Sequence, residues 1–321
     1  MAAVHLLIVN HNIVVIFDMY RFDADGVVTT FVTTESLVYH LERDKFVSGN
    51  IIFSDYSALK TTDGTDTYNI AGIATQWGYV EGVGTVARFF YIISFLQLST
   101  DRVLITDFWN HCVRSLDRIT NETLTFVGNC TNRGNKDGTD ALLTRPAKII
   151  VDIENPTRLL LAEYGGIIKS VEIANGNVSY FGTIVDYNIR SMIQEKDTGD
   201  LIVTFQHGVG LLRYQTREFS VIAGSGQRGF NDGSFNQTRF SYPNSFKFLD
   251  NYTLLVSDRN NLRLRVLNLI SNTSSSVCSG AVGHADGSFS TCSLAFPRGL
   301  LILNETLYVG TTLSIRSMKG E

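Results

Sequence analysis

Short apolar runs that end in glycine and are separated by polar turns repeat through most of the chain. Five of these runs end at Gly72, Gly128, Gly182, Gly224 and Gly280, at intervals of 56, 54, 42 and 56 residues. Each interval contains further apolar runs rich in β-branched and aromatic side chains, which favour strands. No segment keeps the 3.6-residue period of an amphipathic helix. A repeat of this length with about four strands predicts the blades of a β-propeller.

A longer period of 151 residues relates two parts of the chain. Under this shift Gly78 meets Gly229 and Asp107 meets Asp258. The shift also matches Gly82 with Gly233, Arg88 with Arg239, Phe89 with Phe240, Asn110 with Asn261, Arg114 with Arg265, and Asn121 with Asn272. We interpret this pattern as a tandem duplication of a three-blade unit. It predicts six blades.

The two ends of the pattern complement each other. The last repeat has three apolar runs, at residues 299–303, 306–310 and 313–318, and no fourth. Gly26–Phe31, with the sequence GVVTTF, is similar to the missing run. We expect Val27–Phe31 to pair beside Leu313–Met318 and close the ring, because this pairing removes the open edge of the last blade.

The first residues lie outside the repeat pattern. Val4–Phe17 is apolar, but it is too short and too interrupted by His and Asn for a spanning helix, and no later stretch approaches 18 apolar residues. The basic start and the small-residue cleavage site of a signal segment are missing. A signal segment and an ordinary pair of strands are therefore both kept as interpretations of this stretch. We therefore expect residues 1–22 to be a leader or extension and residues 23–321 to be an all-β six-bladed propeller.

Two segments carry a further signature. The sequences DFWNHCVRSLD at 107–117 and SDRNNLRLRVL at 257–267 each have an Asp, an Asn three residues later and an Arg seven residues later. Four segments of the type Gly-x-x-Asp-Gly precede strand starts, at residues 78–85, 134–141, 229–236 and 283–290. These motifs resemble the NHL repeat over about residues 24–320. The resemblance implies an NHL-type propeller and leaves the function open, because one fold hosts many functions.

The other repeats depart from this signature. Those around Glu163, Gln206 and Gly310 lack the Asp, and the repeat at Asp55 lacks the Arg. Where both residues are present, we expect the Asp to accept turn N–H groups and the Arg to reach it as a charge-assisted hydrogen bond. The Asp-Gly pairs that begin at Asp137, Asp232 and Asp286 suit turns that need a positive φ. These roles are structural and not catalytic.

The cysteine pattern favours stapled strands. There are four cysteines and no Cys-x-x-Cys pair, so neither a zinc ribbon nor a thioredoxin-type site is supported. Four cysteines allow three pairings. Proximity under the blade alignment favours disulfides between Cys112 and Cys130 and between Cys278 and Cys292.

Glycosylation acceptors point to the same compartment. Seven Asn-X-Ser/Thr triplets occur, at Asn121, Asn129, Asn177, Asn236, Asn251, Asn272 and Asn304. Most lie where strand-connecting turns are expected, which are the exposed sites that such sugars require. Together with an even number of cysteines, they favour an extracellular or secretory-pathway protein.

Composition narrows the function further. Hydrophobic residues make up 44% of the chain and charged residues 18%, which excludes a disordered protein. A net charge of −4 argues against a general nucleic-acid binder, which needs a positive surface. We expect a monomer with no nucleic-acid partner.

Candidate chemistry is sparse. The sequence GSGQRG at 224–229 fits a dinucleotide-binding fingerprint, but the following residues lack the helix that the fingerprint requires. The six histidines, His5, His11, His40, His111, His207 and His284, have no spacing typical of a metal site. We predict no catalytic residues, no cofactor and no metal ligands.

Two functions remain. The first is a secreted or cell-surface interaction module that binds a protein or glycan partner. The alternative is a propeller hydrolase or lyase with a metal on the central axis, to which His111 and His207 could contribute. For the first function, the candidate partner-binding residues are Trp77, Tyr79 and Phe230, since aromatics contribute strongly at desolvated contacts. We expect their segments to form raised ridges on one face, and packing between blades is the other interpretation of these aromatics.

Overall fold

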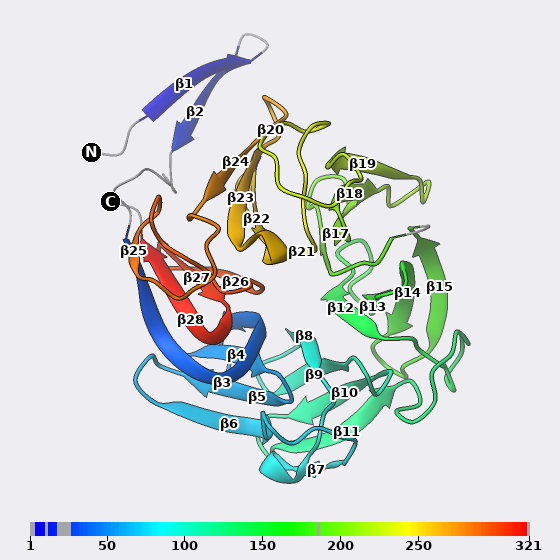
Figure 1. Cartoon of the computed structure of the whole chain (residues 1–321). Coiled ribbons are helices and arrows are strands. Elements are labelled where there is room, and N and C mark those ends of the chain that lie inside the picture. Colours follow the sequence, from blue (N-terminus) through cyan, green and yellow to red (C-terminus); the bar gives the residue numbers. More distant parts are fainter. Residues whose placement is uncertain (1–3, 10–11, 18–26, 185–186, 320–321) are drawn as a thin grey trace.

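The structure is a computed structural model that describes residues 4–9, 12–17, 27–184 and 187–319. Within these ranges the chain is all-β, and its only helical segments are the two short 3-10 turns Gly84–Val86 and Arg259–Asn261. The strands form antiparallel sheets arranged around a common centre (Figure 1). None of the described helical segments has the length and apolar character needed to cross a membrane.

Four sheets each contain four consecutive strands that run outward in chain order from the centre (Figure 1). The first has β8 (Ile92–Gln97), β9 (Arg102–Asp107), β10 (Cys112–Asp117) and β11 (Glu122–Val127). The second has β12 (Pro146–Val151), β13 (Arg158–Glu163), β14 (Ile167–Glu172) and β15 (Val178–Thr183). The third has β16 (Ser191–Gln194), β17 (Leu201–Phe205), β18 (Gly208–Leu212) and β19 (Phe219–Ala223). The fourth has β21 (Pro243–Asp250), β22 (Thr253–Asp258), β23 (Arg263–Asn268) and β24 (Thr273–Val277).

One long strand, β3 (Val27–Arg43), joins the two ends of the repeat pattern in a further sheet. Its order is β26 (Leu300–Leu303), β27 (Thr306–Gly310), β28 (Thr312–Lys319), β3, β4 (Ile51–Asp55), β5 (Ala58–Thr62) and β6 (Thr67–Gly72). The first part of β3 pairs with β28, where Val28 lies opposite Met318, and its last part pairs with β4, where Arg43 lies opposite Ile51. The predicted pairing of Val27–Phe31 beside Leu313–Met318 is therefore confirmed.

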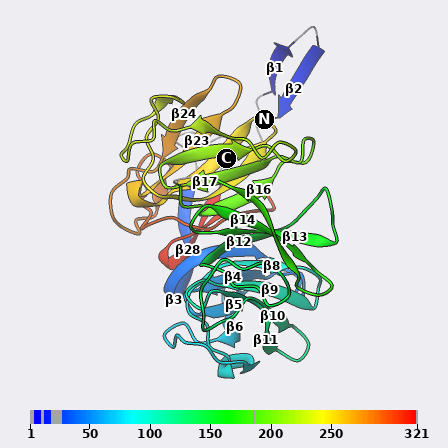
Figure 2. The same ribbon diagram turned by 90° about the vertical axis from the view of Figure 1, so that its right-hand side faces the viewer.

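The N-terminal apolar segment forms two strands. β1 (Val4–Val9) and β2 (Asn12–Phe17) pair with each other in an antiparallel hairpin and, among the described strands, with no other. Both views place this hairpin apart from the other sheets (Figures 1 and 2). Residues 18–22 of the predicted extension lie outside the described residues.

The four Gly-x-x-Asp-Gly segments lie along the outer rim. Three contain short strands, β7 (Gly82–Val83), β20 (Gly233–Ser234) and β25 (Gly287–Ser288), which pair with β11, β24 and β3. The fourth forms a bridge from Gly138 to Val178 on β15. The expectation of raised ridges on one face is wrong. The segments instead fold back onto the outermost strands, because an outermost strand otherwise exposes unpaired N–H and C=O groups.

The hydrophobic core lies between neighbouring sheets. One buried cluster, for example, joins Leu59 of β5 to Phe95 of β8 and Ile105 of β9. Because the apolar faces of the strands are used in these contacts, the inner ends of the sheets are free to carry polar side chains toward the centre.

Candidate functional site

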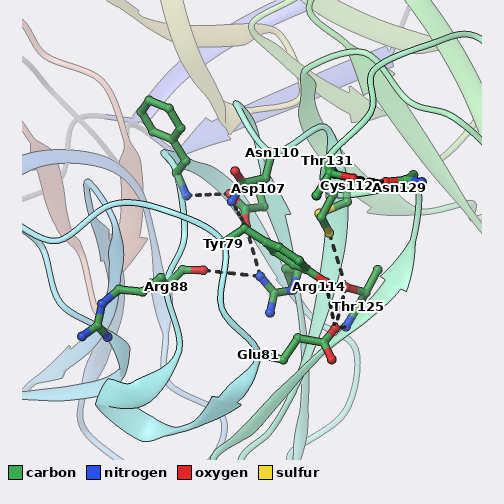
Figure 3. The surroundings of a disulfide bond; sticks show 12 residues. Tyr79, Glu81, Arg88, Asp107, Asn110, Cys112, Arg114, Thr125, Asn129 and Thr131 are labelled. Atoms are coloured by element: carbon green, nitrogen blue, oxygen red, sulfur yellow. Dashed lines mark hydrogen bonds and ion pairs between the residues drawn. A yellow bond between two sulfur atoms is a disulfide. The ribbon is translucent and has the colours of Figure 1, made fainter.

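Both predicted disulfides are present. Cys112 bonds to Cys130, which links the start of β10 to the residues after β11 (Figure 3). Cys278, directly after β24, bonds to Cys292. Each bond closes a short loop at the outer part of a sheet, and none of the described cysteines is free.

The Asp-Asn-Arg signature forms a buried network (Figure 3). The Asp107 carboxylate accepts hydrogen bonds from the Phe90 N–H at 2.7 Å, from Asn110 Nδ2 at 2.9 Å and from Arg114 Nη1 at 3.3 Å. Burial raises the pKa of Asp107 to about 6, so this carboxyl is ionised at neutral pH beside Arg114. Asp258 repeats the arrangement in the fourth sheet. The predicted structural role of Asp107 and Asp258 is therefore confirmed.

The acids of the rim segments have a second role that the sequence reading missed. Asp137 pairs with Lys169 at 2.7 Å and Asp232 with Arg265 at 2.7 Å, and Asp286 pairs with Arg316. Each of these cations is fully buried on the third strand of its sheet. The segment at 78–85 has Glu81 at the equivalent position, and its carboxylate accepts hydrogen bonds from Thr125 instead. The signal in the sequence was an acid about 30 residues before each buried cation.

Two of the aromatic residues predicted to bind a partner, Tyr79 and Phe230, lie on the rim segments. The Tyr79 ring centroid is 4.9 Å from the Arg114 guanidinium carbon, and the Phe230 centroid is 5.1 Å from that of Arg265. Trp77, which is 61% exposed, stacks on Phe90 with ring centroids 4.6 Å apart. These rings remain exposed and do not fill the space between sheets. Tyr79 and Phe230 lie on different sheets, so the fold does not gather the predicted residues into one surface.

Replacing Tyr79 or Phe230 with Ala is expected to lower the free energy of unfolding by about 1–2 kcal/mol. Each change removes a cation–π contact and uncovers a buried guanidinium. Chemical denaturation checks this, with Tyr252→Ala as the control, because that exposed tyrosine lies in the turn between β21 and β22 and should change stability by no more than about 0.5 kcal/mol. Equal small effects in all variants would contradict the covering role.

The second sheet contains a buried acid without a close cation. Glu163 stands where the signature has Asp, and its side chain is 1% exposed. One carboxylate oxygen accepts the Thr144 N–H at 2.7 Å, and the other has no hydrogen-bond partner among the described residues. Burial raises the pKa of Glu163 to about 7, and the Thr144 N–H and the charge of Lys169, which pairs with Asp137, lower it only in part.

Glu163→Gln is expected to stabilise the protein above pH 7 and to have little effect near pH 4. The folded protein holds the Glu163 proton more tightly than the unfolded chain does. Its stabilising contribution is thus complete below the unfolded pKa of about 4.3 and is lost as the pH rises through about 7. The gain is on the order of 3 kcal/mol at most. Denaturation midpoints of Glu163→Gln across this pH range measure the gain. Glu172→Gln is the control, because Glu172 is a more exposed glutamate of the same sheet. An unchanged pH profile in Glu163→Gln would contradict this assignment.

A second cluster lies where the innermost strands begin. Tyr91, Arg145, Arg190 and Tyr242 are the residues directly before β8, β12, β16 and β21. The turns between second and third strands lie at the same end and add Trp109, Tyr164 and Arg259. Together these elements surround a cavity of about 240 Å³, here called the axial pocket. Its lining residues are Tyr91, Ile93, Phe108, Trp109, Arg145, Tyr164, Arg190 and Arg259.

The axial pocket is rich in cations that lack acidic partners. Among the described residues, Arg145, Arg190 and Arg259 form no ion pair, and the Nε atom of each is buried without a hydrogen-bond partner. Arg145 lies over the Trp109 ring at 4.2 Å, and Arg190 donates to the Tyr164 hydroxyl at 3.1 Å. Burial lowers the pKa of Arg190, and nearby Arg259 lowers it further. Arginine nevertheless stays charged in proteins.

The positive character continues along the axis. His40 Nδ1 accepts the Phe95 N–H at 3.1 Å, while its Nε2 lies 3.3 Å from Lys148 Nζ and 3.4 Å from Glu42 Oε1. Burial, followed by the charges of Lys148 and Lys247, keeps the pKa of His40 well below its usual value. Burial also lowers the pKa of Lys148 to about 8. The common centre of the sheets thus has Lys148 and Lys247 near His40, with Glu42 as an acidic neighbour.

This donor set does not fit a metal ion. In the part of the chain that the structure describes, no three His, Cys, Asp or Glu residues come together as ligands. His111 lies next to a turn and His207 lies within one, as expected, but His111 Nδ1 accepts the Arg145 N–H at 3.1 Å. Lysine and arginine side chains near the axis oppose a divalent cation electrostatically.

The acceptor triplets lie outside the axial pocket. Asn121, Asn177 and Asn272 occupy turns between third and fourth strands, as predicted. Asn251 and Asn304 occupy turns between first and second strands, and Asn129 and Asn236 are exposed near the rim. Glycosylation of these residues stays a prediction.

Known proteins resemble the chain in fold. No family model matches it, and no curated protein matches it. Auxiliary nutrient binding proteins from Bacteroides thetaiotaomicron and Bacteroides ovatus are 13% and 14% identical. Their structures cover 92% and 93% of this chain and 76% and 78% of their own, each with a TM-score of 0.70. An extracellular domain assigned to a hybrid two-component system of B. thetaiotaomicron is 14% identical over 91% of this chain and 42% of its own, with a TM-score of 0.58. At these identities the likeness is one of fold.

Proposed function

We propose that this chain is a secreted or cell-surface binding module, built as a closed six-bladed propeller of NHL type, that binds a protein or glycan partner through its axial pocket. The blade count is supported by the four sheets of consecutive strands together with the sheet that β3 divides into two four-stranded units. The Asp-Asn-Arg networks at Asp107 and Asp258 support the NHL assignment.

The extracellular location is supported by covalent chemistry. Two disulfides with no free cysteine among the described residues are typical of an oxidising compartment. The seven acceptor triplets lie away from the axial pocket, so sugars on them would leave it accessible. The similar fold of a bacterial extracellular domain and of two nutrient binding proteins is consistent with this location and with a binding role.

One observation carries the binding function: three guanidinium groups line one cavity, two of them against aromatic rings, and none has an acidic partner among the described residues. An uncompensated charge in a partly buried site is costly for folding. A bound ligand that supplies the missing negative charge would offset this cost. The same cations disfavour the alternative, a hydrolase or lyase with a metal on the axis.

The two tryptophans of the chain offer a matched test, because Trp109 lines the axial pocket, whereas the more exposed Trp77 is not among its lining residues. Secreted protein should be screened against arrays of glycans and extracellular proteins, followed by Trp109→Ala and Trp77→Ala with folding checked by circular dichroism. We expect binding to be lost in folded Trp109→Ala and kept in Trp77→Ala. The reverse result would place the site at Trp77 and outside the axial pocket.

A further inference from the structure

We propose that the axial pocket binds the acidic unit of a glycan, a uronic acid or a sulfated sugar, through contacts between guanidinium groups and oxyanions. This inference rests on the proposed function and adds the chemical class of the ligand.

The first argument is charge. Arg145, Arg190 and Arg259 have buried Nε atoms without a hydrogen-bond partner in the described ranges, and a guanidinium presents several N–H donors in a planar fork. Carboxylate and sulfate oxygens match this fork in paired, charge-assisted hydrogen bonds. The whole chain has a net charge of −4, so attraction of an anion depends on this local cluster and on the lysines further along the axis.

The second argument is the shape and chemistry of the walls. The Trp109 ring is 39% exposed, and its contact with Arg145 places an apolar face beside a cation. A sugar ring has an apolar face that packs on an aromatic ring and hydroxyl groups that exchange hydrogen bonds with phenols. Tyr91 and Tyr164 place such phenols in the pocket wall.

The third argument is size. A cavity of about 240 Å³ lies just below the usual range for small-molecule pockets, so it takes one ring with an acidic substituent and not a folded segment of protein. The rest of a glycan chain would extend from the open mouth. An acidic peptide would have to place a single flexible carboxylate there, with little use for the aromatic walls.

Calorimetric titration tests this assignment. The ligands are an oligosaccharide of uronic acid, a sulfated oligosaccharide, the corresponding neutral oligosaccharide, and a glutamate-rich peptide. We expect at least one of the two acidic glycans to bind, with affinity that falls as salt is added, and the neutral glycan and the peptide to bind at least about tenfold more weakly.

Variants identify the contacts. Arg190→Gln and Arg259→Gln should each weaken binding of the acidic glycan at least about tenfold. Arg43→Gln, which removes an exposed charge at the far end of β3, should leave it unchanged. Near-ultraviolet circular dichroism confirms that each variant is folded. Arg190 and Arg259 belong to different sheets. We therefore expect at least one of the two variants, Arg190→Gln or Arg259→Gln, to fold.

The outcomes separate the two proposals. Equal binding of neutral and acidic glycans, or binding of the peptide alone, would overturn the acidic-glycan assignment. The axial site would still be supported if Trp109→Ala lost binding of that ligand. An acidic glycan that binds equally well to Trp109→Ala and to both arginine variants would overturn the axial site itself. Failure of all four ligands, with an array partner that still depends on Trp109, would overturn only the ligand class.

Discussion

Deleting residues 1–31 is expected to make the protein aggregate. The deletion removes the residues of β3 that pair with the last part of β28, from Val27 opposite Lys319 to Thr30 opposite Arg316, and leaves the pairing that starts at Val32 opposite Ile315. It also removes Val28, which is fully buried in the cluster that contains Met318 and Leu307. The last part of β28, Arg316–Lys319, would then be an exposed edge, and such edges pair with other chains.

Deleting only residues 1–22 is the control. β1 and β2 pair with each other and, within the described ranges, with no other strand, so this shorter deletion should leave the protein monomeric and equally stable. Size-exclusion chromatography and thermal unfolding of the two truncated proteins measure both effects. A stable monomer after deletion of residues 1–31 would contradict closure by β3.

Asp107→Ala is expected to lower the free energy of unfolding by about 3–5 kcal/mol. The change leaves the Arg114 guanidinium fully buried with only carbonyl oxygens, those of Arg88 and Val80, as hydrogen-bond partners. Removing one member of a buried ion pair has an effect of this size. It also leaves the Phe90 N–H without its acceptor.

The duplicated network provides the control. In Asp258→Ala, Arg265 keeps a second carboxylate, that of Asp232, at 2.7 Å from Nη2. The loss of stability should therefore be clearly smaller than in Asp107→Ala. Chemical denaturation of both variants measures the difference. A larger loss in Asp258→Ala would contradict the role assigned to Asp232.

The strands could be predicted because their signals are local. Alternation, β-branched residues and terminal glycines such as Gly72 and Gly128 are recognised within a few residues, and the runs that end at these glycines lie close to β6 and β11. The pairing of β3 with β28 could also be predicted, because one run was missing at one end and one was extra at the other. Both disulfides followed from the alignment of the repeats.

The place of the rim segments could not be predicted in the same way. The Asp-Gly pairs correctly indicated positive φ, which Gly138 and Gly233 adopt at 105° and 117°. Their direction, however, depends on pairing with an outermost strand, and this is a tertiary contact. The sequence suggested turns on a face, whereas the unpaired edges of β11, β15 and β24 determine where these segments lie.

The axial pocket was missed because its residues are isolated in the sequence. Tyr91, Arg145 and Arg190 come from three different repeats and belong to no motif. Their common feature is the position directly before an innermost strand, and this becomes visible only when the strand register is known. The sequence motifs favoured aromatic residues close to them, such as Tyr79, as binding residues. In the structure these rings lie over buried arginines.

Hydrogen exchange of the wild-type protein, with and without the partner that the arrays identify, tests the central claim most directly. If the ligand binds in the axial pocket, amide exchange should slow in the peptides around Tyr91, Arg145 and Arg190, where the innermost strands begin. Exchange in the rim segments at 78–85 and 229–236 should stay unchanged. Slowing confined to these rim segments, with no change around the three axial positions, would contradict the account.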